Sequence, residues 1–105
     1  MTKYERLKQD LETKGTGKMK AFGNSMVPIL KSGSLLTFER KTDYQIGDIV
    51  FCRVKSRYID AHKVFSKDSR RGYLIGNNHG FENGWTHQIF GKAIQAEWGN
   101  EVKHL

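Results

Sequence analysis

Residues 23–33 read GNSMVPILKSG, and they are the most informative segment of the chain. Gly23 and Asn24 can place Ser25 on a tight turn with its hydroxyl exposed, and Pro28 stiffens the exit from that turn. Taken alone, a serine in this setting is most often a turn or helix-capping residue. The interpretation of Ser25 therefore depends on the segments that follow it.

Three further segments follow this stretch in order. They read GDIV at residues 47–50, AHKV at residues 61–64 and IGNNHGFENGWTHQIFG at residues 75–91. Together with GNSMVPILKSG, they resemble the motifs of signal peptidase I and its relatives, the LexA-like and phage-repressor self-cleaving domains. The resemblance covers roughly residues 19–95. It implies a mainly β fold, a LexA/signal-peptidase-like folded sheet or partly open barrel, in a stand-alone and possibly phage-type serine peptidase.

The resemblance also implies roles for two residues. Ser25 matches the nucleophile, and a serine hydroxyl needs a neighbouring base to react at neutral pH. That base is a buried lysine in the bacterial and LexA-like branch and a histidine in the archaeal and endoplasmic-reticulum branch. The matching position here is His62, and an imidazole titrates close to neutral pH. The other interpretation of His62 is a polar strand residue without a catalytic duty.

Lys63 is the alternative base. Successive side chains of a strand point to opposite faces, so only one of His62 and Lys63 can face Ser25. The alignment of the AHKV segment with the family motif favours His62.

One departure from the family pattern concerns the group that orients the base. Where the family has Gly-Asp-Asn, residues 76–78 read GNN, so an amide replaces the acid. The remaining candidates for orienting His62 or lining the cleft are Asp60, Asn77, Asn78 and Glu82. An amide can orient an imidazole by hydrogen bonding, but it cannot stabilise an imidazolium as a carboxylate does.

Hydrophobic patterning predicts one N-terminal helix followed by short strands. Apolar side chains on one face predict the helix over residues 2–13, and glycines end it. The strands are expected at residues 18–22, 35–39, 48–54, 57–65, 72–76 and 89–98. Lys55 and Ser56 form the tip of a hairpin, and Gly91 marks a possible bulge. Residues 76–88 are expected to form an irregular loop, part of which (76–85) borders Ser25. We divide the chain into a helix or arm (residues 1–17) and a β domain (residues 18–105).

Composition and charge limit the function. Eighteen Lys and Arg face eleven Asp and Glu, which leaves a net charge of +7. Cys52, the single cysteine, lies in the apolar run IVFCRV and is expected to be a buried free thiol, which suits a reducing compartment. The charged start of the chain does not resemble a signal peptide, and no apolar run is long enough to span a bilayer. We therefore expect a cytoplasmic protein without a membrane anchor, a cofactor or a metal.

Two functions from different classes remain. The first is a serine endopeptidase that uses Ser25 and His62 to cleave an unknown protein or peptide. The second is a catalytically inactive relative that binds a partner, which includes a host protein or, weakly and in a salt-sensitive way, a polyanion. The motifs around Ser25 and His62 favour the first function, and the basic charge and the amide in the GNN loop favour the second.

Overall fold

One helix and eight strands make up the fold in the computed structural model, which describes every residue from Met1 to Leu105. The helix α1 spans Lys3–Lys14. The strands are β1 Thr16–Ala21, β2 Ser34–Glu39, β3 Ile49–Val54, β4 Arg57–Asp68, β5 Gly72–Gly76, β6 Glu82–Thr86, β7 Gln88–Trp98 and β8 Glu101–His104. The prediction of a mainly β fold with one short N-terminal helix is therefore confirmed.

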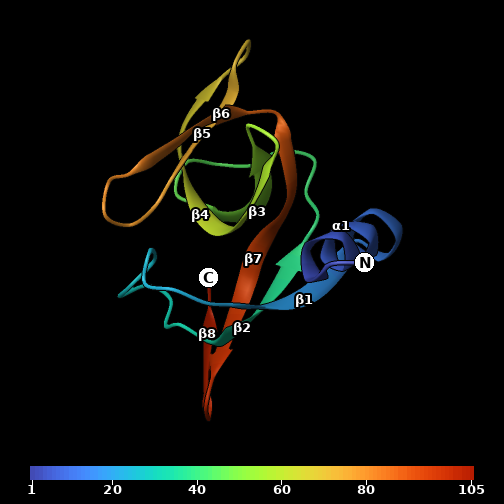
Figure 1. Cartoon of the computed structure of the whole chain (residues 1–105), viewed down its shortest axis with the longest axis vertical. Coiled ribbons are helices and arrows are strands. Elements are labelled where there is room, and N and C mark those ends of the chain that lie inside the picture. The colour runs from blue at the N-terminus through green and yellow to red at the C-terminus, as the bar shows by residue number, and fades with distance from the viewer.

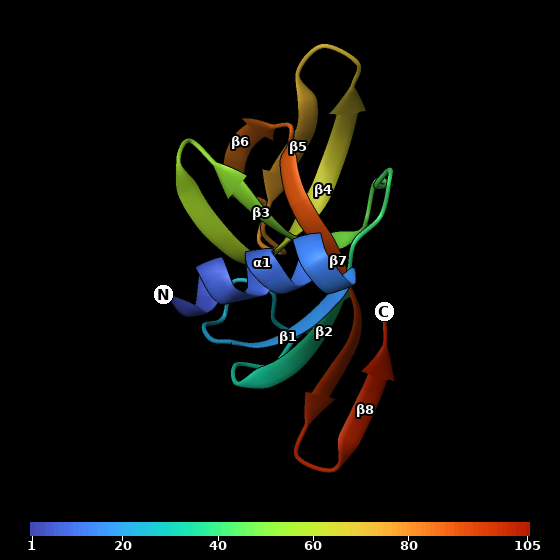
Figure 2. The same cartoon turned by 90° about the vertical axis from the view of Figure 1, so that its right-hand side faces the viewer.

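Helix α1 owes its boundaries to local signals at both ends. Thr2 and Glu5 form a capping box, in which each side chain bonds the backbone N–H of the other residue. Gly15 ends the helix in the left-handed region with φ 78°. Leu7 and Leu11 lie one turn apart and are 1% and 0% exposed. The helix thus buries one apolar stripe against the sheet, with contacts to β1 and β7 (Figure 2).

All the strands belong to one antiparallel sheet. The strand order is β1-β2-β7-β3-β4-β5-β6, and β8 extends the sheet by pairing with β7. The long strand β7 joins the two halves, because its first residues pair with β3 and its later residues pair with β2. The strands from β3 to β7 curl into a ring, whereas β1 and β2 run beneath it next to α1 (Figure 1). The molecule is thus a folded sheet with a barrel-like half.

Strand β3 separates two hydrophobic clusters. Phe51 belongs to the larger cluster beneath α1, whereas Val50 and Cys52 belong to the smaller cluster inside the curled half. Cys52 is fully buried and free, as predicted, and burial raises the pKa of its thiol to about 12. The central strand is therefore apolar on both faces, and the rest of the sheet wraps around it.

The predicted hairpin tip at Lys55 and Ser56 is present, and the structure has two strands that the sequence did not predict. Lys55 and Ser56 form the tip between β3 and β4, with φ of 51° and 67°, as a two-residue turn of this hand requires. The strands β6 and β8 were not predicted. β6 lies within the expected loop at residues 76–88 and has little apolar alternation, and every residue of β8 is exposed.

The helix α1 is too short and too polar to cross a membrane.

Candidate active site

Ser25 lies in the connection between β1 and β2, and two side chains of this connection are buried in the core. Met26 and Leu30 are 4% and 5% exposed and belong to the larger hydrophobic cluster. Leu30 N donates to Met26 O at 2.9 Å, so this part of the connection forms one compact turn. Gly33 N donates to Ala21 O at 2.7 Å and closes the connection. Burial of Met26 therefore anchors the neighbouring Ser25, which stays half-buried.

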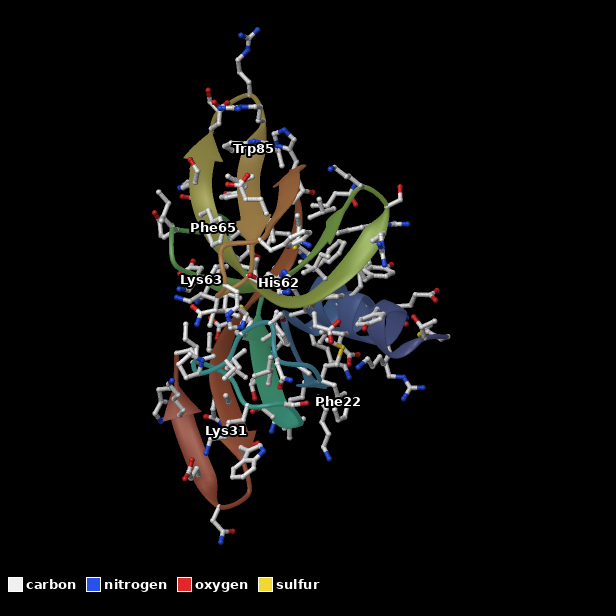
Figure 3. The ribbon with its side chains drawn as sticks, turned by 60° about the vertical axis from the view of Figure 1, so that its left-hand side comes forward. Phe22, Lys31, His62, Lys63, Phe65 and Trp85 are labelled. Atoms are coloured by element: carbon white, nitrogen blue, oxygen red, sulfur yellow. The ribbon has the colours of Figure 1, made fainter.

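His62 lies opposite Ser25 on β4. Its Nε2 is 3.1 Å from Ser25 Oγ, and its Nδ1 is 2.6 Å from Asn83 Oδ1. Because the Asn83 oxygen can only accept, Nδ1 carries the proton and Nε2 is left to accept from the Ser25 hydroxyl. This is the tautomer that a general base needs. His62 and Lys63 lie at the centre of the molecule, where the curled strands meet the β1–β2 connection (Figure 3).

Asn83 is the site residue that the sequence did not reveal. The pairing of β5 with β6 shifts between Ile75–Gly84 and Gly76–Glu82, so Asn83 is the extra residue of a β-bulge. A bulge leaves its residue unpaired and can re-aim the side chain. Gly84, at φ 131°, gives the backbone the freedom that the bulge needs. The glycine after Asn83 was the available signal, but it points to a bulge only once β6 is known to be a strand.

The residues that we considered for orienting His62 lie elsewhere. Asn77 Oδ1 accepts from the backbone N–H groups of His79 and Phe81, at 2.8 and 3.1 Å, and thereby shapes its own loop. Glu82 is exposed and makes no hydrogen bond with His62. Both ring nitrogens of His62 are already engaged with Ser25 and Asn83. The four residues were candidates for orienting His62 or for lining the cleft, and the partner of His62 Nδ1 is a different residue, Asn83.

Asn78 ties its loop to the Ser25 connection. Its backbone N donates to Ser25 O at 2.9 Å, and its Nδ2 donates to Val27 O at 3.0 Å. Lys63 Nζ donates to Asn78 Oδ1 at 3.1 Å, and this is the hydrogen bond that its ammonium makes. The loop thus borders Ser25 as the sequence predicts, and Lys63 supports the loop without bonding Ser25.

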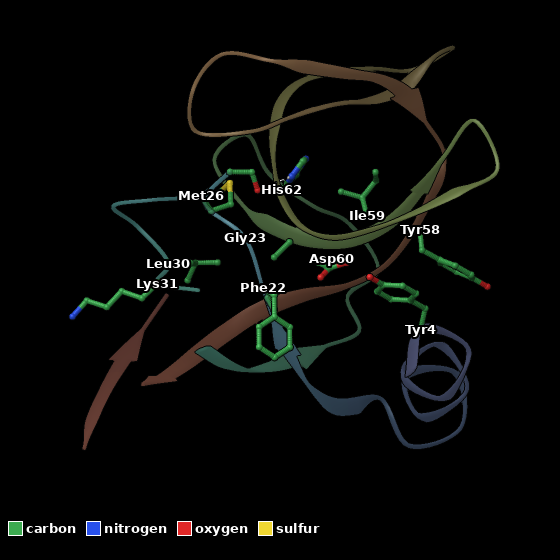
Figure 4. A pocket seen from close by; sticks show the side chains of 13 residues that line it. Tyr4, Phe22, Gly23, Met26, Leu30, Lys31, Tyr58, Ile59, Asp60 and His62 are labelled. Atoms are coloured by element: carbon green, nitrogen blue, oxygen red, sulfur yellow. Dashed lines mark hydrogen bonds between the residues drawn. The ribbon is translucent and has the colours of Figure 1, made fainter. Parts of the chain in front are cut away.

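Asp60 takes part in a pocket that opens beside Ser25 and His62. The pocket has a volume of about 310 Å³. Asp60 lies between Phe22 and Tyr4, and Met26 and His62 lie at the other end (Figure 4). Burial and then a hydrogen bond to Asp60 raise the pKa of the Tyr4 hydroxyl to about 12. Asp60 is therefore a residue of the cleft and not the partner of His62.

The backbone at Ser25 offers free hydrogen-bond donors. The N–H groups of Asn24, Ser25 and Met26 donate to no acceptor within the chain. Successive unpaired N–H groups beside a nucleophile can hold the oxyanion of a tetrahedral intermediate.

No three His, Cys, Asp or Glu side chains come together in the arrangement that a metal ion requires.

A folded antiparallel sheet with a serine and a histidine in contact at the mouth of a pocket is the arrangement that the resemblance to the LexA/signal-peptidase-like superfamily implies. The comparison with protein families agrees with this class, since the family model described as Peptidase S24-like matches residues 2–94. The chain belongs to that family. The match includes α1, which contributes to the same core as the strands. No curated protein matches the chain.

Proposed function

We propose that the protein is a serine endopeptidase in which Ser25 is the nucleophile, His62 the general base and Asn83 the residue that orients His62. The observation that carries this proposal is the double engagement of the His62 ring, 3.1 Å from Ser25 Oγ on one side and 2.6 Å from Asn83 Oδ1 on the other. A histidine fixed on both sides has one tautomer and one orientation, which a merely structural surface histidine does not need.

The proposed reaction follows from these positions. His62 Nε2 takes the Ser25 hydroxyl proton while Oγ attacks the peptide carbonyl carbon, and the N–H groups near Ser25 hold the oxyanion. His62 then gives the proton to the leaving amine as the peptide C–N bond breaks, which leaves an ester on Ser25. A water molecule, deprotonated by His62, hydrolyses that ester and restores the hydroxyl.

A fluorophosphonate probe tests the nucleophile without knowledge of the substrate. Attack by Ser25 Oγ displaces fluoride, so we expect one covalent adduct, located at Ser25 by peptide mass spectrometry. Ser25→Ala should abolish the adduct, and His62→Ala should slow its formation by roughly 10² or more. Lys63→Ala should slow it far less, because the Lys63 ammonium bonds Asn78 and not Ser25.

Two results would contradict the proposal. One is the absence of any adduct on a folded protein, and the other is labelling that survives His62→Ala at the original rate. The double variant Ser25→Ala/His62→Ala, assayed on a cleaved peptide, should be no worse than either single variant, because residues that act as a unit are not additive.

A second function is favoured by the amide at the orienting position and by the net charge of +7. In this alternative the protein is a non-catalytic member of the family that binds a partner protein or a polyanion through its basic surface. A Ser25→Ala protein that keeps its full biological effect would favour this function. A cytoplasmic location, in keeping with the free Cys52 thiol, is proposed for either function.

A further inference from the structure

The pocket beside Ser25 holds a carboxylate that has no basic partner. Asp60 takes part in none of the ion pairs of the chain, although basic residues outnumber acidic ones by eighteen to eleven. Its neighbour is the uncharged Tyr4 hydroxyl. A half-buried carboxylate with only a neutral partner retains the capacity to accept hydrogen bonds from a cation.

The walls of the same pocket suit a cation as well. Tyr4, Phe22 and Tyr58 line it, and aromatic faces attract ammonium and guanidinium groups. The chain already uses this property, because Lys3 Nζ lies 5.2 Å from the ring centroids of both Tyr4 and Phe22. The Lys3 ammonium donates to Lys20 O at 3.3 Å and makes no ion pair with Asp60.

The other lysine of the pocket does not neutralise Asp60. Lys31 contributes to the lining, but its ammonium lies 3.6 Å from Glu101 and 4.2 Å from the centroid of the Trp98 ring. Trp98 ends β7 and Glu101 begins β8. The Lys31 side chain extends away from Asp60 (Figure 4). The pocket therefore presents a carboxylate without an ion-pair partner, in a protein of positive net charge.

Asp60 also lies at a useful distance from the reacting atoms. It precedes His62 by two residues on β4, which corresponds to about 6–7 Å along a strand. The β3–β4 pairing shifts between Val50–His62 and Cys52–Ile59, so Asp60 lies within a bulged part of β4. Both Asp60 and His62 line the pocket. A peptide with its carbonyl carbon at Ser25 Oγ can thus extend the side chain of a nearby residue to Asp60.

We propose that this pocket selects a lysine or arginine side chain within two residues of the scissile bond, with Asp60 accepting its hydrogen bonds and the aromatic rings packing against its stem and charge. The inference rests on the proposed peptidase function, because it names the substrate class of that site. Asp60 is a specificity-determining residue in this scheme, and it takes no part in the proton transfers.

Capped peptides test the preference directly. The probes are acetylated and amidated octapeptides of alanine and glycine that carry one Lys, norleucine or Glu at one of the four central positions, so that no terminal charge competes. We expect the Lys peptides to be cleaved about 10- to 100-fold faster than the norleucine peptides, as a charged hydrogen bond allows, and the Glu peptides to be cleaved slowest. Asp60→Asn, which keeps an oxygen for Tyr4, should bring the Lys-to-norleucine ratio close to one.

Glu97→Gln is the matched control, because it removes the same charge from β7 at a position outside the pocket. It should leave the ratio as in the original protein. Cleavage without a Lys preference, or a preference that survives Asp60→Asn, overturns the inference.

Binding separates this inference from the proposed reaction. In the Ser25→Ala protein, the affinity for fluorescent versions of the same peptides should show the Lys preference and lose it on addition of Asp60→Asn. If no peptide is cleaved but this preference is measured, the pocket assignment stands and the peptidase proposal fails. Equal affinities for the Lys and norleucine peptides overturn the pocket assignment, whether or not cleavage occurs.

Discussion

Asn83 accepts the His62 Nδ1–H at 2.6 Å through an oxygen that carries no formal charge. The bond sets the tautomer of His62, but it leaves the imidazolium of the proposed transition state with less electrostatic support than a carboxylate would provide. The residue therefore has two separable effects, orientation and charge, and they can be tested with two substitutions.

Asn83→Ala removes the orientation, so we expect the rate of fluorophosphonate labelling or peptide cleavage to fall by roughly 10²-fold. Asn83→Asp keeps the orientation and adds a negative charge that stabilises the protonated ring. The rate should rise, because a carboxylate supports the imidazolium that forms in the proposed transition state. Equal rates for Asn83→Ala and the original protein would remove Asn83 from the mechanism.

The limits of sequence reasoning are clearest at this residue. The Ser25 and His62 positions follow from motifs, and the structure brings the two side chains to 3.1 Å. Asn83 has no motif, because its role depends on a bulge in β6, a strand that the amino-acid pattern does not indicate. The same pattern suggested Asn77 and Asn78, whose amides instead shape the loop and tie it to the Ser25 connection. Side-chain direction at a bulge is a tertiary property.

Helix α1 and strand β7 show how glycines couple elements. The sequence marks Gly91 as a possible bulge, and the β7 register does shift next to it, between Phe51–Gly91 and Cys52–Ile89. A closer reason lies in the helix, since a Cβ on Gly91 would lie 3.0 Å from both δ carbons of Leu11. The missing side chain lets Leu11 pack against the strand backbone.

This packing predicts the stability of two variants. Leu11→Ala should lower the free energy of unfolding by about 2–5 kcal/mol, because Leu11 is fully buried at 0% exposure and the loss of its side chain leaves a cavity between the helix and the sheet. Gly91→Ala should lower it by about 1–3 kcal/mol through overpacking. Urea unfolding followed by circular dichroism measures both. Glu12→Ala, on the exposed side of the helix, is the control and should stay within about 0.5 kcal/mol. A Leu11→Ala protein as stable as that control would mean that α1 does not pack on the sheet.

The connection between β2 and β3 is held by a carboxylate with a perturbed pKa. Asp43 accepts from the Tyr73 hydroxyl at 2.7 Å and from Lys67 Nζ at 2.9 Å. These two bonds, the Tyr73 bond first, lower the pKa of Asp43 to about 2. They join the connection to β4 and β5, because Lys67 lies on β4 and Tyr73 lies on β5.

A depressed carboxyl pKa determines the pH range of its contribution. The Asp43 carboxylate stabilises the fold above the unfolded-state pKa of about 4, and this stability is lost as the pH falls toward the folded-state value of about 2. Asp43→Asn should therefore make the melting temperature fall less steeply as the pH is lowered from 4 to 2. Asp68→Asn removes another exposed carboxyl with a lowered pKa and serves for comparison. An unchanged acid profile in the Asp43→Asn protein would show that the carboxyl has the same pKa in the folded and unfolded states.

Across the whole molecule, the pattern of apolar residues predicted the central strands and the helix better than the strands at the edges of the sheet. Six strands and the helix follow from apolar periodicity, because their side chains fill the two hydrophobic clusters. β8 was missed because every one of its residues is exposed, so only its backbone pairing with β7 makes it a strand. The Peptidase S24-like match over residues 2–94 ends before β8. Elements that contribute side chains to the core can be predicted from the apolar pattern of the sequence, whereas a strand that only extends the sheet leaves no such pattern.

The net charge of +7 is also a property of the whole molecule, and it predicts a general affinity for polyanions. Its basic residues are spread along the chain, so no dedicated groove is needed and binding should depend on the release of counterions. We expect weak binding to heparin and to single-stranded DNA at about 50 mM salt, and loss of most of that binding at about 200 mM salt.

Fluorescence anisotropy with two labelled DNA strands of unrelated sequence measures both the salt dependence and the selectivity. The affinities for the two strands should be equal, because phosphate contacts carry no sequence information. Binding that persists at high salt, or that separates the two strands by ten-fold or more, would require a shaped nucleic-acid site and would raise the binding-module function above the peptidase function.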